Sequence, residues 1–138
     1  MCERNNITFV PVNWFEFDVF KGSFDKFPSD ERLRSEEELS HWLQKQLSLF
    51  NKGAIPFNSV EYDKITQEKY EWLQSVNPEL QNIVWNARHY IMVARVKNVI
   101  EENEGKRILC IHGADHNYWY YAALKDEKNI EVIYPLRS

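Results

Sequence analysis

The sequence is poor in the residues that cross-link a chain or hold it in a membrane. Its two cysteines, Cys2 and Cys110, offer neither a disulfide framework nor the spacing of a zinc site. No apolar run approaches the ~18 residues that a membrane-spanning helix needs, and the N-terminus shows no signal-peptide core. The sequence therefore predicts a cytoplasmic protein of a reducing compartment, with no membrane partner.

Basic residues are also sparse. The chain has 17 Lys and Arg against 21 Asp and Glu, a net charge of −4, and no basic cluster longer than two residues. Non-specific nucleic-acid binding requires a basic face, so we expect no nucleic-acid partner. What the chain does have is a hydrophobic content of 43% with five tryptophans, enough for one domain over residues 1–138. Aromatic side chains can fill a core, and they can also line ligand pockets or partner surfaces.

Helical signals dominate the middle of the chain. Ser35 and Glu38 have the spacing of a capping box, and apolar residues then recur at helical intervals to about residue 50. Gly53 and Pro56 are expected to close that helix.

Two more helices are predicted downstream. Residues 62–76 follow a helical pattern. Asn77 and Pro78 are a favourable helix start, with Asn as N-cap and Pro in the first turn. This third helix is expected to run to about residue 103 and to stop at Gly105.

The remaining apolar runs predict strands. Residues 7–12 form one, with Pro11 indicating an edge or an end, and residues 107–112 and 130–134 form two more around a helix over about 117–125. That ending is a βαβ pattern. We therefore predict a single α/β domain whose small, mainly parallel sheet is flanked by helices and belongs to a larger sheet.

An aromatic, irregular segment follows the first predicted strand. Residues 13–27 interleave aromatic and acidic side chains and could form a covering loop or a short helix. Glu16 and Asp18 are the acidic residues placed to join a binding site there, although either could simply solvate the loop.

The most informative stretch is residues 106–116, KRILCIHGADH, in which an apolar run ends at a Gly-x-x-His turn. Ligands collect at the carboxyl ends of strands in open α/β sheets, where His112 and His116 would lie. Gly113 would permit the tight turn, through a positive φ or a close backbone approach, and Asp115 is placed to cap the next helix.

His116 would then fall in the first turn of a helix. The helix dipole disfavours an imidazolium there, and a neutral imidazole suits a general base or a ligand of a divalent metal ion. A surface or capping histidine is the other interpretation. For Cys110, inside the apolar run, a buried small hydrophobe is favoured over a nucleophile.

Arg88 interrupts an apolar stripe of the third predicted helix. Its neighbours at helical spacing include Val84, Met92 and Val99. A guanidinium on such a face could bind an anionic substrate group or the developing charge of a reaction, or it could pair with a nearby carboxylate. His89 points about 100° away on the helix and is expected to be exposed.

Residues 85–92, WNARHYIM, and 105–116, GKRILCIHGADH, resemble the end of a larger superfamily. They are similar to the TraB/Tiki/erythromycin-esterase-like group, in particular its small bacterial members, whose C-terminal half reads Arg-Asn-x-x-Met and then Gly-Ala-x-His. The resemblance covers about residues 78–136. The matching positions are Arg88, Met92, Gly113, Ala114 and His116, with His89 in place of the usual Asn.

The resemblance implies a hydrolase-like α/β fold with Arg88 and His116 in the active site, and it raises the prospect of a divalent metal ion. The N-terminal Gly-x-x-His motif of such proteins is absent, since only Gly113 has a histidine three residues on. Either the chain lacks an N-terminal half, or it is a reduced member without activity. The alternative function is a non-enzymatic interaction module that uses residues 13–27 and an open sheet edge, with a partner chain or a second copy as occupant.

Overall fold

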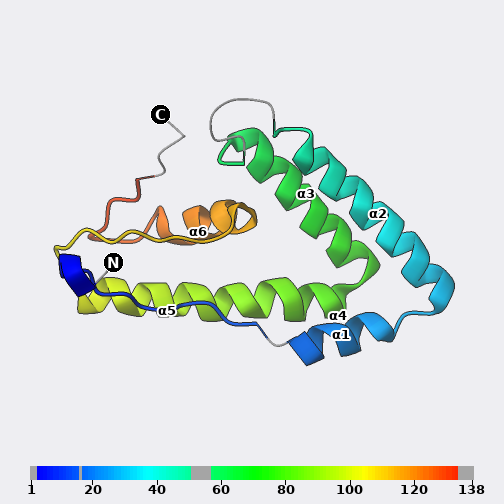
Figure 1. The fold of residues 1–138 in the computed structure, drawn as a ribbon, viewed down its shortest axis with the longest axis horizontal. Helices are drawn as coiled ribbons and strands as arrows, with labels where there is room; N and C mark the ends of the chain where they lie inside the picture. Colours follow the sequence, from blue (N-terminus) through cyan, green and yellow to red (C-terminus); the bar gives the residue numbers. More distant parts are fainter. Residues whose placement is uncertain (1–2, 16, 51–56, 134–138) are drawn as a thin grey trace.

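The computed structural model describes residues 3–15, 17–50 and 57–133, and over these residues the protein is helical (Figure 1). The elements in chain order are η1 (Glu3–Asn5), α1 (Phe17–Asp25), α2 (Ser29–Leu47), α3 (Val60–Val76), α4 (Pro78–Gln81), η2 (Asn82–Ala87), α5 (Arg88–Glu102), η3 (Ala114–His116) and α6 (Asn117–Leu124). The aromatic segment 13–27 thus contains a short helix, α1, which was one of its two predicted forms.

The prediction of an α/β fold is wrong. Residues 7–12, 107–112 and 130–133 lie outside helices, but the described part of the chain contains no strand and no sheet. Instead, Val12, Ile130 and Val132 pack individually against apolar side chains of α5 and α6. An apolar run looks the same in sequence whether or not another strand lies beside it, so the pattern could not reveal the missing pairing. Cys110 is correspondingly exposed rather than buried in a strand.

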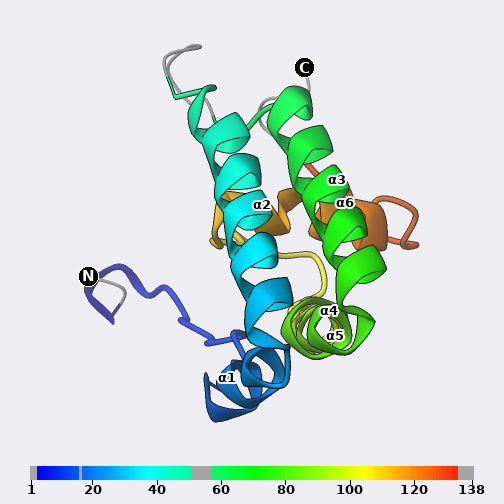
Figure 2. The ribbon, with the colours of Figure 1, turned by 90° about the vertical axis from the view of Figure 1, so that its right-hand side faces the viewer.

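Helices α2 and α3 form an antiparallel hairpin, which Figure 2 shows side by side. α2 begins after Pro28, so Ser35 lies inside the helix and the predicted capping box is wrong. Acidic residues in the first turn stabilise this earlier start through the helix dipole. α3 matches its prediction closely, with the Ser59 side chain accepting a 3.1 Å hydrogen bond from the backbone N–H of Tyr62. Gly53 and Pro56 lie outside the described residues.

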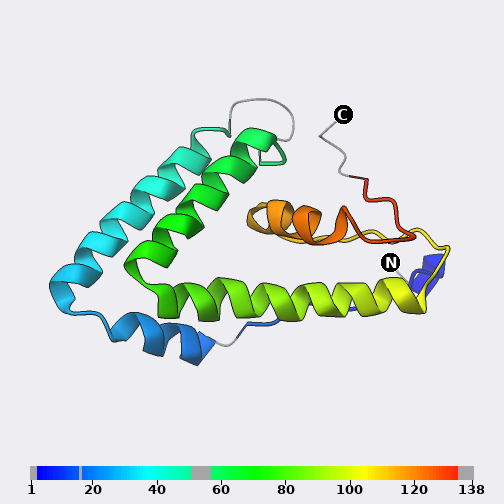
Figure 3. The ribbon, with the colours of Figure 1, turned by 180° about the vertical axis from the view of Figure 1, so that it is seen from behind.

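The third predicted helix is confirmed as a continuous rod made of α4, η2 and α5, which begins at the lower end of α3 and extends away from α2 (Figure 3). Asn77 caps it by accepting a 3.0 Å hydrogen bond from the backbone N–H of Leu80, and Pro78 occupies its first turn. The rod ends at Glu102, and Gly105 turns the chain with φ of 74°. Within the rod, η2 is a π-helical insertion, a feature that often lies at functional sites.

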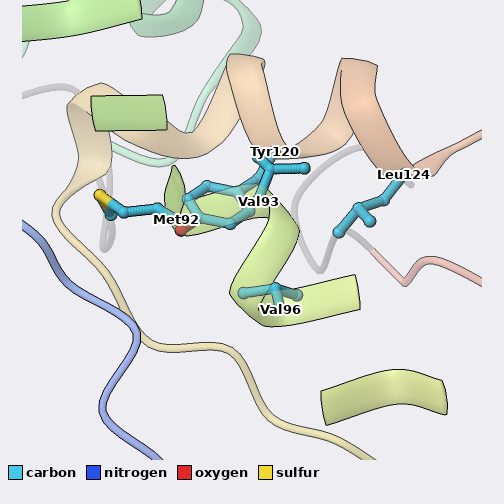
Figure 4. Packing of buried hydrophobic residues seen from close by; sticks show 5 residues of the cluster. All are labelled: Met92, Val93, Val96, Tyr120 and Leu124. Carbon is cyan, nitrogen blue, oxygen red and sulfur yellow. The ribbon is translucent and has the colours of Figure 1, made fainter. Parts of the chain in front are cut away.

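The apolar core lies between α5 and α6. Its buried members, Met92, Val93 and Val96 from α5 and Tyr120 and Leu124 from α6, face one another in Figure 4. α6 agrees with the helix predicted over residues 117–125. The chain reaches it through η3, which carries the Gly-x-x-His turn, so this core fixes the turn against the long rod.

Candidate functional site

Two histidines from distant parts of the sequence meet at the centre of the protein. Nδ1 of His116, in η3, lies 2.7 Å from Nε2 of His89, in the first turn of α5. His89 is fully buried and His116 is 9% exposed. The expectation that His89 is exposed is therefore wrong. Regular helical spacing places His89 on the same face of α5 as the buried Val93 and Val96, four and seven residues further on. The prediction takes the stripe through Arg88 as the buried face instead.

The hydrogen bonds determine which ring nitrogens carry protons. Nδ1 of His89 lies 2.6 Å from the backbone oxygen of Trp85, which can only accept, so Nδ1 is the donor. In the neutral ring Nε2 of His89 is then an acceptor, and it accepts a hydrogen bond from the Nδ1–H of His116. Nε2 of His116 is left with its lone pair available, the state that a base or a metal ligand requires.

Burial keeps both rings neutral. It lowers the pKa of His89 to about 4, and the nearby Arg88 charge lowers it further. Burial also lowers the pKa of His116 to about 3, with added contributions from the adjacent His89 and from Arg88. Both imidazoles are therefore unprotonated at neutral pH, so the hydrogen-bond direction inferred above holds under physiological conditions.

Aromatic rings enclose the pair. The Trp85 indole stacks on His116, with ring centroids 5.3 Å apart, and on Tyr70 at 3.3 Å. Its Nε1 donates a 2.9 Å hydrogen bond to the hydroxyl of Tyr118. These contacts restrict the rotation of both imidazoles, and the low-polarity surroundings explain why their pKa values fall.

His112 lies at the edge of this cluster. Its ring stacks on Tyr120 with centroids 4.6 Å apart, and its centroid is 6.1 Å from that of His116. Its Nδ1 lies 3.1 Å from the backbone oxygen of Gly113, which places the donor on that nitrogen. The two predicted histidines are thus brought together, with His89 as a third that the sequence did not predict.

The described residues contain no group of three or more His, Cys, Asp or Glu side chains arranged to hold a metal ion. Both nitrogens of His89 are already engaged in hydrogen bonds, which leaves His116 and His112 as the nearest imidazole ligands.

Gly113 also differs from its expected role. Its φ is −65°, and an added Cβ would meet only Cδ2 of His116 at 3.8 Å, so the turn requires neither a positive φ nor a close approach.

The prediction that Asp115 caps a helix is wrong. Its carboxylate instead accepts hydrogen bonds from residues of the α2–α3 hairpin. Its Oδ2 lies 2.6 Å from Nζ of Lys69, and its Oδ1 accepts bonds from the Tyr62 hydroxyl at 2.6 Å and from Gln46 Nε2 at 3.0 Å. Burial alone raises the pKa of this carboxyl, but the Lys69 charge and these hydrogen bonds outweigh it and bring the pKa below its usual value. Asp115 is therefore an ionised anchor next to His116.

The hairpin residues around Asp115 form a closed polar network that the sequence analysis missed. Lys69 is only 4% exposed, and its ammonium also donates to Gln46 Oε1 at 3.0 Å. Gln46 in turn donates to Thr66 at 2.7 Å. A signal was present, because Tyr62, Thr66 and Lys69 recur at i, i+4 and i+7 and so form one polar stripe on a helix.

Arg88 belongs to the same region, since its charge lowers the pKa of both buried histidines. It forms no ion pair with a carboxylate in the described part of the chain. Its Nη2 donates a 2.8 Å hydrogen bond to Oδ1 of Asn13, and its guanidinium lies 5.3 Å from the Phe15 ring centroid. Its Nε is buried without a hydrogen-bond partner among the described residues. Glu16, the remaining predicted binding residue, lies outside the described residues.

Comparison of the chain with protein families, curated proteins and solved structures finds no match. Among the described helices, none combines the length and the apolar character required to cross a membrane. The function must therefore be argued from the site itself.

Proposed function

We propose that the chain carries a histidine acid–base centre for hydrolysis, with His116 as the general base. The supporting observation is the directed chain of hydrogen bonds from the Trp85 carbonyl through His89 to His116. It leaves the Nε2 lone pair of His116 oriented and available. His89 fixes the tautomer of His116, which is the orienting part of the role that a carboxylate plays in a catalytic triad. His89 is neutral and does not stabilise an imidazolium, so with its pKa lowered to about 3 His116 is a weak base and slow turnover is expected.

In this reaction Nε2 of His116 takes a proton from a water molecule whose oxygen attacks the substrate's carbonyl carbon. The proton then passes from the imidazolium to the departing alkoxide, so that the base is regenerated. Arg88 stabilises the oxyanion that forms between these steps. Its Nη2 is held in place by the hydrogen bond that it donates to Oδ1 of Asn13, and its Nε has no hydrogen-bond partner among the described residues, which supports this assignment.

The test is hydrolysis of a panel of chromogenic carboxylate esters, with and without a chelator and added divalent metal ions. We expect turnover that falls by about 100-fold or more in His116→Ala and by a smaller factor in Arg88→Ala. His41→Ala, which removes an exposed histidine on α2, is the matched control and should retain full activity. Absence of turnover over the whole panel, or equal activity in His116→Ala and His41→Ala, would overturn the proposal.

A second candidate is an interaction module, favoured by one specific feature. Leu109 and Ile111 are 83% and 82% exposed in a segment outside any helix whose backbone pairs with no described strand. The predicted open sheet edge is wrong, but an exposed apolar segment with free backbone groups can still pair with a strand of a second copy. On this candidate, light scattering detects a dimer that Leu109→Lys converts to a monomer. A wild-type monomer at all concentrations would contradict it.

The cytoplasmic location expected from the cysteine content forms part of the same proposal. A thiol as exposed as that of Cys110 persists unpaired in a reducing compartment.

A further inference from the structure

An open groove separate from the histidine centre lies between α2 and α3, and is called the cavity below. Its volume is about 350 Å³, within the range of ligand pockets, and none of the residues around it belongs to the histidine or Asp115 clusters. α2 contributes four lining residues and α3 contributes one, and they are Glu37, Glu38, His41, Trp42 and Trp72. Two indoles from facing helices thus share a cavity with two carboxylates.

The charge around this cavity is unbalanced. No Lys or Arg is among its lining residues, although the Lys45 ammonium lies on the ring of Trp42. Neither Glu37 nor Glu38 forms an ion pair over the residues that the structure describes. The negative faces of the two indole rings add to the attraction for a positive group. An anion would be repelled here, and a neutral apolar ligand would leave the attraction of the carboxylates unused.

One indole already binds a cation. The ammonium of Lys45 lies 4.0 Å from the ring centroid of Trp42, one helical turn along α2. The contact is between neighbouring side chains of one helix and shows that a face of the Trp42 ring is accessible to a positive group. A ligand would use the other face of the ring or displace Lys45. An inorganic cation such as Ca²⁺ would need about six to eight oxygen ligands. The two carboxylates supply at most four, and the indoles supply none.

We propose that this cavity binds a small organic cation, namely a quaternary ammonium group, between Trp42 and Trp72 with Glu37 and Glu38 as counter-charges. A quaternary ammonium spreads its charge over apolar methyl groups, so it can contact both indoles at little desolvation cost while remaining near the carboxylates. The cation site does not depend on the histidine centre, so either proposal can be wrong without affecting the other.

The experiment is a titration followed by NMR of the indole N–H resonances, with choline as the probe. Its neutral isostere 3,3-dimethylbutan-1-ol has the same shape without the charge. We expect choline to shift the Trp42 and Trp72 signals with a Kd of ~1 mM or tighter, and the alcohol to bind at least about tenfold more weakly. Equal binding of the two compounds, or no shift with choline, would overturn the proposal.

Variants test the lining residues. Glu38→Gln, which keeps shape and removes charge, should weaken choline binding by about fivefold or more, and Trp72→Leu by more than that. Glu36→Gln is the matched control, because it removes a carboxylate from the same turn without lining the cavity, and it should bind within about twofold of wild type. Equal losses in Glu36→Gln and Glu38→Gln would mean that only net charge matters and would contradict the site. Binding of Ca²⁺ that displaces choline would contradict it as well.

Discussion

The contact between His116 Nδ1 and His89 Nε2, 2.7 Å long, joins the Gly-x-x-His turn to the long central helix. The direction of this hydrogen bond is fixed. Nδ1 of His89 already donates to the backbone carbonyl of Trp85, so Nε2 of the neutral His89 ring can only accept. A residue of the π-helical insertion therefore sets the protonation pattern of a histidine more than 25 positions away along the chain.

Both buried histidines should carry their proton on Nδ1. In water the Nε2–H form of a neutral imidazole predominates, so the expected pattern is distinctive. Nitrogen-15 NMR of the rings at pH 7.5 should show a protonated Nδ1 and an unprotonated Nε2 for His89 and His116. His89→Phe should release His116 to the common tautomer. An Nε2–H signal for His116 in the wild type would contradict the relay, whatever the activity assays show.

Stability should fall as the pH drops from 7.5 to 5.5. The folded-state pKa values of about 4 for His89 and about 3 for His116 lie below the ordinary value near 6.5. The unfolded chain therefore binds protons in this interval that the folded chain does not. The stabilisation is complete above about pH 6.5 and is lost as the pH falls toward the folded-state values, with a loss of about 1 kcal/mol per histidine by pH 5.5.

Urea unfolding across this pH interval measures the effect. Replacing both buried histidines with Gln should flatten the dependence, whereas His41→Gln should leave it unchanged. Asp115 does not affect the unfolding free energy in this pH interval. Its pKa is lowered, so the stability that its carboxylate provides is lost only in more acidic solutions. A wild-type unfolding free energy that rises on acidification from pH 7.5 would contradict the prediction.

The Lys69–Asp115 pair should behave as a coupled unit. Lys69→Met leaves a partly buried carboxylate with no counter-charge, and Asp115→Asn leaves a buried ammonium with none, so each should cost about 3 kcal/mol of unfolding free energy. The double variant should cost clearly less than the sum, as measured in a double-mutant cycle. The exposed pair Lys26–Glu79 is the control, and its disruption should cost less than about 1 kcal/mol. Additive losses for Lys69 and Asp115 would argue against the network.

Removing the cap of the long helix should also destabilise the protein. Asn77→Ala loses the hydrogen bond to the backbone of Leu80, and we expect a cost of about 1 kcal/mol in thermal or urea unfolding. Asn82→Ala changes an exposed asparagine of the same rod away from its start and should be near neutral. Equal effects of the two changes would mean that the cap contributes nothing.

Much of the helical structure could be predicted because its signals are local. Asn77 and Pro78 start a helix and Gly105 ends the turn after it through contacts within a few residues, so these positions needed no knowledge of the fold. The sequence predicts part of the residue cluster, and its chemical role stays a prediction. His112, His116 and Arg88 lie in one region, whereas the sequence predicts an exposed His89 and assigns no role to Lys69.

The failures have a common physical cause. The runs 107–112 and 130–134 have strand composition, but a strand exists only if another backbone lies alongside it, and composition does not specify that partner. The role expected for Asp115 as a helix cap relied on local spacing, but a buried ammonium from another helix attracts its carboxylate more strongly.

The sequence by itself thus determined where the principal helices from α3 onward start and stop, because caps, breakers and periodicity act over a few residues. That the Gly-x-x-His turn carries chemistry stays a prediction. Only the tertiary structure decided that the extended runs form no sheet over the described residues. It also decided that His89 lies on the buried face of α5 against His116, and that Lys69 holds Asp115 beside it. Those outcomes depend on which distant groups share a low-dielectric interior, where an unpaired charge or hydrogen-bonding group is costly and must find its partner.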